Sequence, residues 1–301
     1  MFCSWGKKIR TKYTQIQIKY YYLMKNTILI FITFWVSLNL YSQNDYPKEK
    51  VRLDTDIWLG LAIQISPNKF NKNTTLGNDF ASRNTFYVRA LGKRSTMNMT
   101  DGDYFYQKIL YLSYERLLSQ KWIGGLSYRY SELNINTNTL RSHLRHYSTI
   151  KKIDFTFWQQ IAFERILSNN SFYKPISRLR FQFSANKYFN ISKNNPEKKL
   201  IGTISFELFK EIQKIHPDSE RRFFQEQRIQ TEWLFPIYKN IYLGVFAGFH
   251  TKQYIALAQF DMNEKEIKPT RKLNQQTPVF GLHATLTFGK NTIPNKRLWI
   301  E

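Results

Sequence analysis

Hydrophobic and polar residues alternate along both arms of residues 152–189, and this pattern predicts a β-hairpin. The apolar row contains Ile153, Phe155, Phe157, Ile161 and Phe163 in the first arm and Leu179, Phe181, Phe183, Ala185 and Phe189 in the second. Four positions of the polar row carry a full charge, namely Asp154, Glu164, Arg178 and Arg180. Successive side chains of a strand point to opposite faces, so each arm has one apolar and one polar face. Aromatic residues on one face and charges on the other are typical of a barrel that is apolar outside and polar inside.

The same alternation recurs in eight further segments. These are residues 53–66, 85–91, 104–118, 122–134, 200–210, 223–235, 241–251 and 278–288, whereas the Asn-rich residues 134–148 are interpreted as a link. Together with the hairpin they predict an all-β fold, an antiparallel up-and-down transmembrane β-barrel over residues 53–288, with about 10 strands in a range of about 8–12. Ten is an even number, and an even number of strands is expected of a closed bacterial barrel with both chain ends in the periplasm.

The N-terminal region has the features of a secretory signal peptide. Lys25 follows Met24, residues 27–40 are mostly apolar, and residues 40–42 form a plausible cleavage site. We therefore expect a signal peptide over residues 24–42, which directs export to the outer membrane. Residues 1–23 are interpreted as an upstream extension from a start site assigned too early. Residues 43–52 then form a polar lead-in, and residues 289–301 form a C-terminal tail.

The chain is strongly basic, with a formal net charge of +23. Residues 1–42 hold six basic residues and no acidic one, so 39 basic and 22 acidic residues remain after them, a net charge of +17. Such a surplus suits nucleic acid or phosphate-bearing lipid headgroups, and an export signal favours the headgroups. We expect a monomer in contact with the lipid bilayer, with no nucleic acid partner. Cys3 is the only cysteine, so neither a disulfide framework nor a cysteine metal site is expected, and no cofactor is expected either.

Charged residues on the polar faces predict a filled lumen, because a barrel of this size is narrow. The inward carboxylates are expected to be Asp56, Glu115, Asp154, Glu164, Glu207, Glu226 and Glu232, and the inward guanidinium groups Arg129, Arg178, Arg180 and Arg228. Buried charges persist when they are paired and hydrogen-bonded. The pattern therefore predicts a network of lumenal salt bridges and no open pore.

The histidines give one candidate for catalysis. His146 and Ser148 share a face of an extended chain, and a His-x-Ser pair resembles what outer-membrane lipid A deacylases use. A nucleophilic serine also needs an oxyanion site and a group that orients the histidine, and neither is evident. His143 and His146 diverge on a strand, which argues against a metal site, while His250 and His283 are expected to form hydrogen bonds in the lumen. The favoured function is therefore a non-enzymatic structural, binding or minor transport role. A lipid hydrolase is the first alternative, and a soluble periplasmic β-sandwich is the second.

Several short motifs resemble a known family. They are His-Leu-Arg-His-Tyr at residues 143–147, Phe-Glu-Arg-Ile at 163–166, Arg-Leu-Arg-Phe at 178–181, Phe-Glu-Leu-Phe at 206–209 and Tyr-Leu-Gly at 242–244. Over roughly residues 55–288 the chain is similar to the domain of unknown function 2490, a family of bacterial outer-membrane β-barrels. The resemblance implies a fold and a location. It implies no established activity.

Overall fold

The computed structural model describes residues 48–67, 84–96, 105–119, 121–133, 136–150, 155–170, 174–191, 199–212, 224–256, 258–262 and 265–289. The strands in these ranges are β1 Lys48–Arg52, β2 Asp56–Ser66, β3 Asn84–Ser95, β4 Gln107–Leu117, β5 Trp122–Glu132, β6 Thr137–Ile150, β7 Phe155–Ser168, β8 Ile176–Asn190, β9 Lys199–Glu211, β10 Glu226–Tyr238, β11 Ile241–Ala256, β12 Gln259–Phe260, β13 Glu266–Lys268 and β14 Arg271–Gly289. No helix among the described residues is long and apolar enough to cross a membrane. The predicted signal peptide, the upstream extension and nearly all of the tail lie outside these ranges.

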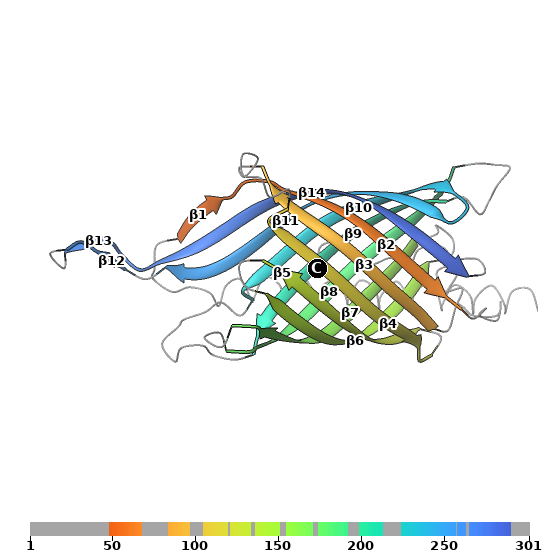
Figure 1. Ribbon diagram of the computed structural model, residues 1–301, viewed down its shortest axis with the longest axis horizontal. Coiled ribbons are helices and arrows are strands. Elements are labelled where there is room, and N and C mark those ends of the chain that lie inside the picture. The colour runs from red at the N-terminus through yellow and green to blue at the C-terminus, as the bar shows by residue number, and fades with distance from the viewer. Residues whose placement is uncertain are drawn as a thin grey trace, which may run out of the picture. The chain divides into compact units, whose positions relative to one another are not determined.

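The strands from β2 to β11 pair in sequence order, and β14 joins β11 to β2, so that eleven of the described strands close into a barrel (Figure 1). Each strand from β2 to β10 pairs antiparallel with the next, and β11 pairs antiparallel with β14. The pair of β14 and β2, which closes the barrel, is parallel. The predicted all-β barrel of about 10 strands is thus confirmed. The alternative of a β-sandwich is wrong, because the aromatic rows lie on the outside of one closed sheet.

The expected even number of strands is wrong by one, because the segment interpreted as a link contains a strand. β6 pairs with β5 and β7 along its length. Its buried row is Thr139, Arg141, His143, Arg145 and Tyr147, which is mostly polar. An odd number of strands makes β2 and β14 run in the same direction, and this is why the closing pair is parallel. We call the rim at which β2 begins the N-terminal rim and the rim at which β14 ends the C-terminal rim.

The predicted polar lead-in also takes part in the sheet. β1 pairs in parallel with β14 from Lys48 opposite Lys272 to Arg52 opposite Gln276, and β2 resumes this pairing with Asp56 opposite Val279. Residues 53–55, which link β1 to β2, therefore oppose only residues 277–278 of β14, so the segment from β1 to β2 has one extra residue. This bulge lies beside Pro278, which has no backbone N–H to donate to a ladder. β1 and β2 thus behave as one strand that the bulge interrupts.

At the N-terminal rim, β11 and β14 continue beyond the barrel wall. Their pairing runs as far as Ala256 opposite Arg271, whereas β10 begins with Glu226 opposite Lys252. The small hairpin of β12 and β13 lies at the end of this extension (Figure 1).

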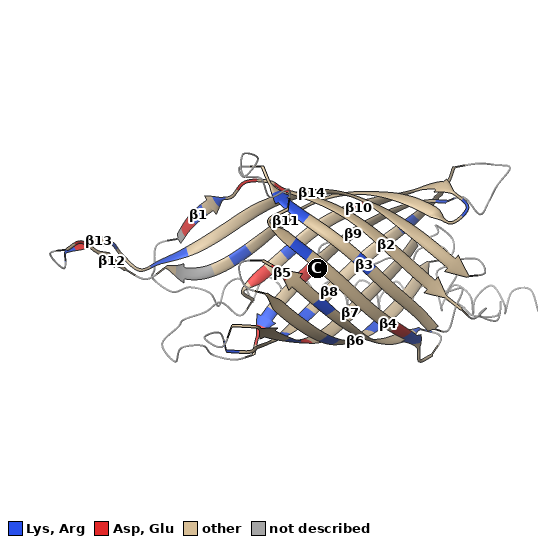
Figure 2. Cartoon of the chain, in the orientation of Figure 1, with Lys and Arg blue, Asp and Glu red and all other residues tan. Residues whose placement is uncertain are grey.

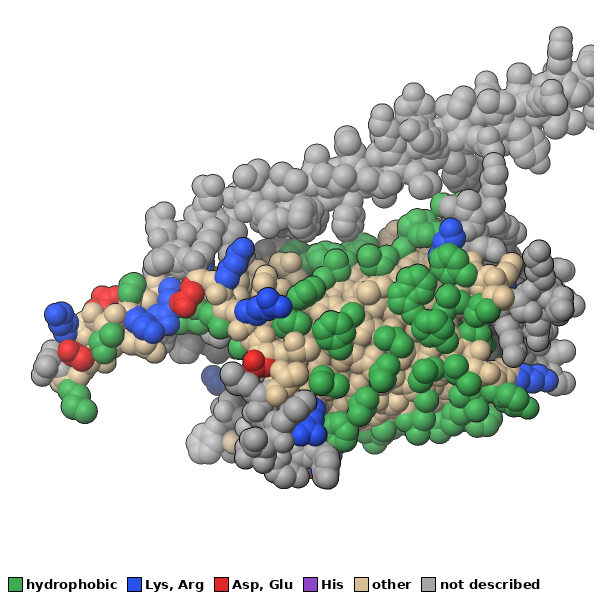
Figure 3. All heavy atoms as spheres, turned by 90° about the horizontal axis from the view of Figure 1, so that it is seen from above, with side chains coloured by type: hydrophobic (Ala, Val, Ile, Leu, Met, Phe, Trp, Pro, Cys, Tyr) green, Lys and Arg blue, Asp and Glu red, His purple; other side chains and the backbone are tan. Residues whose placement is uncertain are grey.

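The barrel has an apolar outer face and a polar inner face. Figure 3 shows hydrophobic side chains spread over the outer surface of the barrel, with charged side chains at its rims and on the projecting hairpin. Among the exposed residues of the outer face are Leu61, Phe86, Leu126, Leu140, Ile161, Phe163, Ile204, Phe249, Phe280 and Leu282. The buried residues include many charged ones, which appear as bands across the strands in Figure 2. A water-soluble protein normally shows the reverse arrangement.

Candidate functional site

Six charged side chains form a closed ring of alternating sign inside the barrel, which we call the lumenal ring. Its members, in order, are Glu164, Arg178, Glu226, Arg228, Glu207 and Arg180. The nitrogen–oxygen distances are 3.2 Å for Arg178–Glu226, 2.6 Å for Arg228–Glu226, 3.8 Å for Arg228–Glu207, 2.5 Å for Arg180–Glu207 and 3.6 Å for Arg180–Glu164. The Arg178 Nε donates a hydrogen bond to Glu164 and closes the ring. Every member of the ring is a residue that the sequence predicted to be lumenal.

Strand register explains two of these contacts directly. Glu164 lies opposite Arg178 in the pairing of β7 with β8, and Glu207 lies opposite Arg228 in the pairing of β9 with β10. Side chains in directly opposed positions on the same face have Cβ atoms about 4.5–5.5 Å apart. Opposite charges at these positions therefore meet as soon as the strands pair.

A buried aromatic ring lies between the arginines of the lumenal ring. Phe209 on β9 is opposite Arg180 on β8 and Glu226 on β10. The guanidinium carbons of Arg178, Arg180 and Arg228 lie 4.6, 5.3 and 4.7 Å from the centre of its ring. Each arrangement is a cation–π contact, and such contacts are stronger away from water. The alternation pattern did not single out Phe209, because it follows another buried apolar residue, Leu208.

Two carboxylates of the lumenal ring have further partners. The Arg141 Nε lies 2.7 Å from Glu164 Oε1, so three guanidinium groups surround this carboxylate, which has no exposed side-chain surface. His250 Nε2 lies 2.5 Å from Glu226 Oε1, beside the contacts from Arg178 and Arg228. A carboxylate offers about four lone-pair sites on its two oxygens. Glu164 and Glu226 therefore have little remaining capacity for another cation.

Glu115 belongs to a separate cluster that includes two residues of the strand that the sequence analysis missed. His143 Nε2 lies 2.8 Å and Arg145 Nη2 lies 3.1 Å from Glu115 Oε1. His143 is on β6 and Glu115 is on β4, so the imidazole crosses over β5 to reach the carboxylate. Gly125 lies between them on β5, where an added Cβ would be 2.4 Å from His143 Cε1.

Glu232 has the same kind of environment. His283 Nε2 on β14 lies 2.6 Å from Glu232 Oε1 on β10. The imidazole crosses over β11 at Gly244, where an added Cβ would be 1.8 Å from His283 Nε2. In both clusters a glycine on the middle strand leaves the space through which a histidine reaches a glutamate two strands away.

The remaining predicted lumenal charges have different surroundings. The Tyr106 hydroxyl donates to Asp56 Oδ2 at 3.0 Å, at the N-terminal rim. Arg129 points inward from β5, between the buried Ser127 and Ser131, and forms no hydrogen bond or ion pair with the described residues. Asp154 lies outside the described residues. Arg89, Arg141, Arg145 and His143 are buried in the lumen and were missed, although the regular spacing of the last three along residues 141–145 was a usable signal.

The His146 and Ser148 pair is on the outer face of β6. The two residues do share a face, and the His146 ring packs on Trp122 with 4.7 Å between ring centres. Among the residues that the structure describes, no carboxylate contacts His146 to orient it. The same part of the chain contains no cluster of three or more His, Cys, Asp or Glu residues suited to a metal ion. The described residues thus do not assemble a hydrolytic site at this pair.

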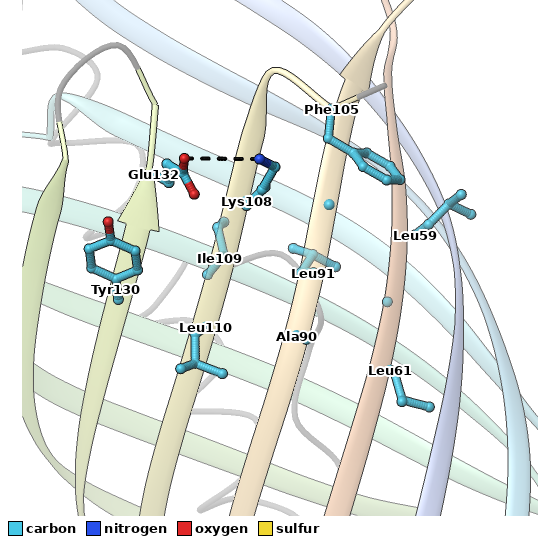
Figure 4. Close-up of a pocket in the computed structure, with 12 residues that line it drawn as sticks. Leu59, Leu61, Ala90, Leu91, Phe105, Lys108, Ile109, Leu110, Tyr130 and Glu132 are labelled. Atoms are coloured by element: carbon cyan, nitrogen blue, oxygen red, sulfur yellow. Dashed lines mark ion pairs between the residues drawn. The ribbon is translucent and has the colours of Figure 1, made fainter. Parts of the chain in front are cut away.

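A shallow apolar hollow lies on the outer face near the N-terminal rim. It is lined by Leu59, Leu61, Ala90 and Leu110, and Phe105 lies beside it in Figure 4. The ion pair of Lys108 with Glu132, at 3.9 Å, marks its edge. Both members of the pair are more than half exposed, and the remaining lining is mostly aliphatic, with the aromatic rings of Phe105 and Tyr130. The hollow offers contacts for a hydrocarbon chain and no reactive group.

The geometry defines a class of protein, a closed β-barrel whose charged groups point inward and are paired across the strands. Comparison with models of protein families gives no match, and comparison with curated proteins gives no significant match. The resemblance to the domain of unknown function 2490 therefore stays a prediction.

Proposed function

We propose that this protein is an integral outer-membrane β-barrel with a non-enzymatic structural or binding role, and that its ion-paired lumen acts as a permanent plug. The observation that supports this most strongly is the polarity of the closed barrel. Large apolar residues cover the outside, and many charged residues of the barrel strands, such as Glu164, Arg180 and Glu232, are buried inside.

The outer and inner faces of the barrel suit different solvents. In hydrocarbon, every backbone N–H and C=O needs a partner within the protein, and a closed barrel supplies one because it has no edge strand. The charges that do point outward lie near strand ends: Lys108 is the second residue of β4, Arg116 is its penultimate residue, and Glu132 is the last residue of β5. Such positions suit the headgroup layers, whereas the positions between them suit acyl chains.

Export to the outer membrane is supported by the signal-peptide pattern of residues 24–42 and by the resemblance to a family of outer-membrane barrels. A non-enzymatic role is supported by the state of the lumenal carboxylates. Glu164, Glu207 and Glu226 are each in contact with at least two arginines. This pairing favours a fixed charged state, and general acid–base catalysis requires a group that exchanges its proton near the working pH.

The proposal is tested by fractionating cells and by electrophoresis of the detergent-extracted outer-membrane fraction with and without boiling. We expect the protein in that fraction, with a mobility that changes on heating because the barrel stays folded in detergent until it is boiled. Steady conductance across a planar bilayer should be absent, since the lumen is plugged. Extraction without detergent would contradict the membrane assignment, and a stable open channel would contradict the plug.

A further inference from the structure

Two cationic side chains in the lumen have no acidic partner among the described residues. Lys93 on β3 and Arg129 on β5 form no ion pair and no hydrogen bond with the residues that the structure describes. The Lys93 Nζ lies over the ring of Trp58, 3.9 Å from its centre, which places it inside the barrel. Arg129 is in register with Tyr111 and Thr139, both of which are buried in the lumen. Both cations lie toward the N-terminal rim.

The charges around this pair are mainly positive. The charged groups that act most strongly on Lys93 among the described residues are Arg228, Arg129, Asp56 and Lys252, of which one is acidic. For Arg129 the strongest are Arg178, Glu164, Arg141 and Arg228, of which again one is acidic. Glu164 is already in contact with three guanidinium groups. The described residues therefore leave an excess of positive charge between Lys93 and Arg129.

Lys93 and Arg129 are less deeply buried than several other lumenal arginines. Lys93 and Arg129 are both partly exposed, whereas Arg89, Arg141 and Arg180 are 2%, 4% and 1% exposed. The two cations therefore keep some accessible surface, which the deeper arginines largely lack.

We propose that Lys93 and Arg129 form a binding site for a small oxyanion of the phosphate class at the N-terminal mouth of the lumen. The planar guanidinium of Arg129 can hold two oxygens of such an anion, and the Lys93 ammonium supplies a second point charge. The anion would supply the negative charge that the surrounding carboxylates cannot. The site depends on the closed barrel alone, so it goes beyond the proposed membrane location and does not require it.

The test is calorimetric titration of the purified full-length protein in detergent with inorganic phosphate, at constant ionic strength against sodium chloride. We expect binding by the wild type and a loss of affinity of about tenfold or more in the Lys93→Gln/Arg129→Gln double variant, because charge-assisted hydrogen bonds are lost. The matched control is Lys108→Gln, which removes an outward lysine of the neighbouring strand and should bind phosphate as the wild type does.

Vesicles of phosphatidylglycerol supply the second arm, since a lipid headgroup carries the same chemistry. Binding of free phosphate by the detergent-solubilised protein would assign the site to a soluble anion, and binding only to the vesicles, lost in the double variant, would assign it to a headgroup. The idea is overturned if the wild type binds neither, or if the double variant binds as the wild type does while its electrophoretic mobility still changes on heating. A protein that binds phosphate but is absent from the outer membrane would refute only the proposed location.

Discussion

At the scale of single residues, Glu164 shows how the lumen tolerates buried charge. Its carboxylate is fully buried and is in contact with Arg141, Arg178 and Arg180. An ion taken out of water needs such partners, because the loss of hydration is worth several kcal/mol. The negative charge of the carboxylate also offsets the repulsion among the three guanidinium groups. Its removal is therefore expected to matter more than the removal of a surface charge.

We predict that Glu164→Gln lowers the free energy of unfolding by about 3–5 kcal/mol, because three buried guanidinium groups lose their shared counter-charge. The measurement is urea unfolding in detergent, followed by tryptophan fluorescence. The matched control is Glu132→Gln, which removes the partner of Lys108 in an exposed pair and should change the free energy of unfolding by about 1 kcal/mol or less. Equal effects of the two variants would show that the lumenal ring contributes no more than a surface pair.

At the scale of the element, the strands combine an outer row that is easy to recognise with an inner row that is not. β6 was missed because its inner row is Thr139, Arg141, His143, Arg145 and Tyr147 and its outer row includes Ser142, His146 and Ser148. Only Leu140 and Leu144 mark its apolar face strongly. The strand is stable in its place because β7 supplies a carboxylate to Arg141, and β4, two strands away, supplies one to His143 and Arg145. The segments with aromatic outer rows, such as β7 and β8, were predicted without this information.

The glycine between His143 and Glu115 gives a prediction at the same scale. Replacing glycine by alanine commonly stabilises a protein by about 0.4–1 kcal/mol where the backbone allows it. Gly125→Ala is expected to do the opposite and to destabilise the barrel by about 1.5–3 kcal/mol, because the new Cβ would displace the imidazole from a buried carboxylate.

Urea unfolding in detergent measures this change, and the adjacent Gly124 supplies the control. Its added Cβ would be on the outer face, 3.0 Å from the terminal Cδ1 of Leu118, a flexible side chain that can move aside. Gly124→Ala should therefore shift the free energy of unfolding by less than about 1 kcal/mol. If both variants behave alike, the passage of His143 over Gly125 is not important for stability.

At the scale of the whole molecule, the parallel pairing of β14 with β2 determines how the barrel closes. Eleven strands bring Leu61 opposite Ala284 on the outer face. A barrel with an even number of strands would pair its first and last strands in opposite directions, and a different set of residues would meet. The closing pair is therefore the place where the strand count can be measured.

We predict that cysteines at Leu61→Cys and Ala284→Cys form a disulfide within one chain in a Cys3→Ser background, because opposed residues of paired strands have Cα atoms within the reach of a disulfide. Mass spectrometry of the cross-linked peptides identifies the bond. The control pairs Leu61→Cys with Phe280→Cys, four residues along β14 and about 13 Å farther along the strand, and it should stay reduced. A bond in the control and none in the test pair would refute this register.

The alternation of residue types by itself determined the strands with aromatic rows, the division of each strand into an apolar and a polar face, and the placement of six charges on the polar face, since a side-chain period of two is a local property of an extended chain. Tertiary structure decided the eleventh strand, the parallel closure, the position of Phe209 among three arginines and the passage of two histidines over glycines. The reason is physical. Each of these features depends on which residues of different strands lie opposite one another, and partners such as Glu115 with His143 are brought together only by hydrogen-bond register and closure of the whole sheet.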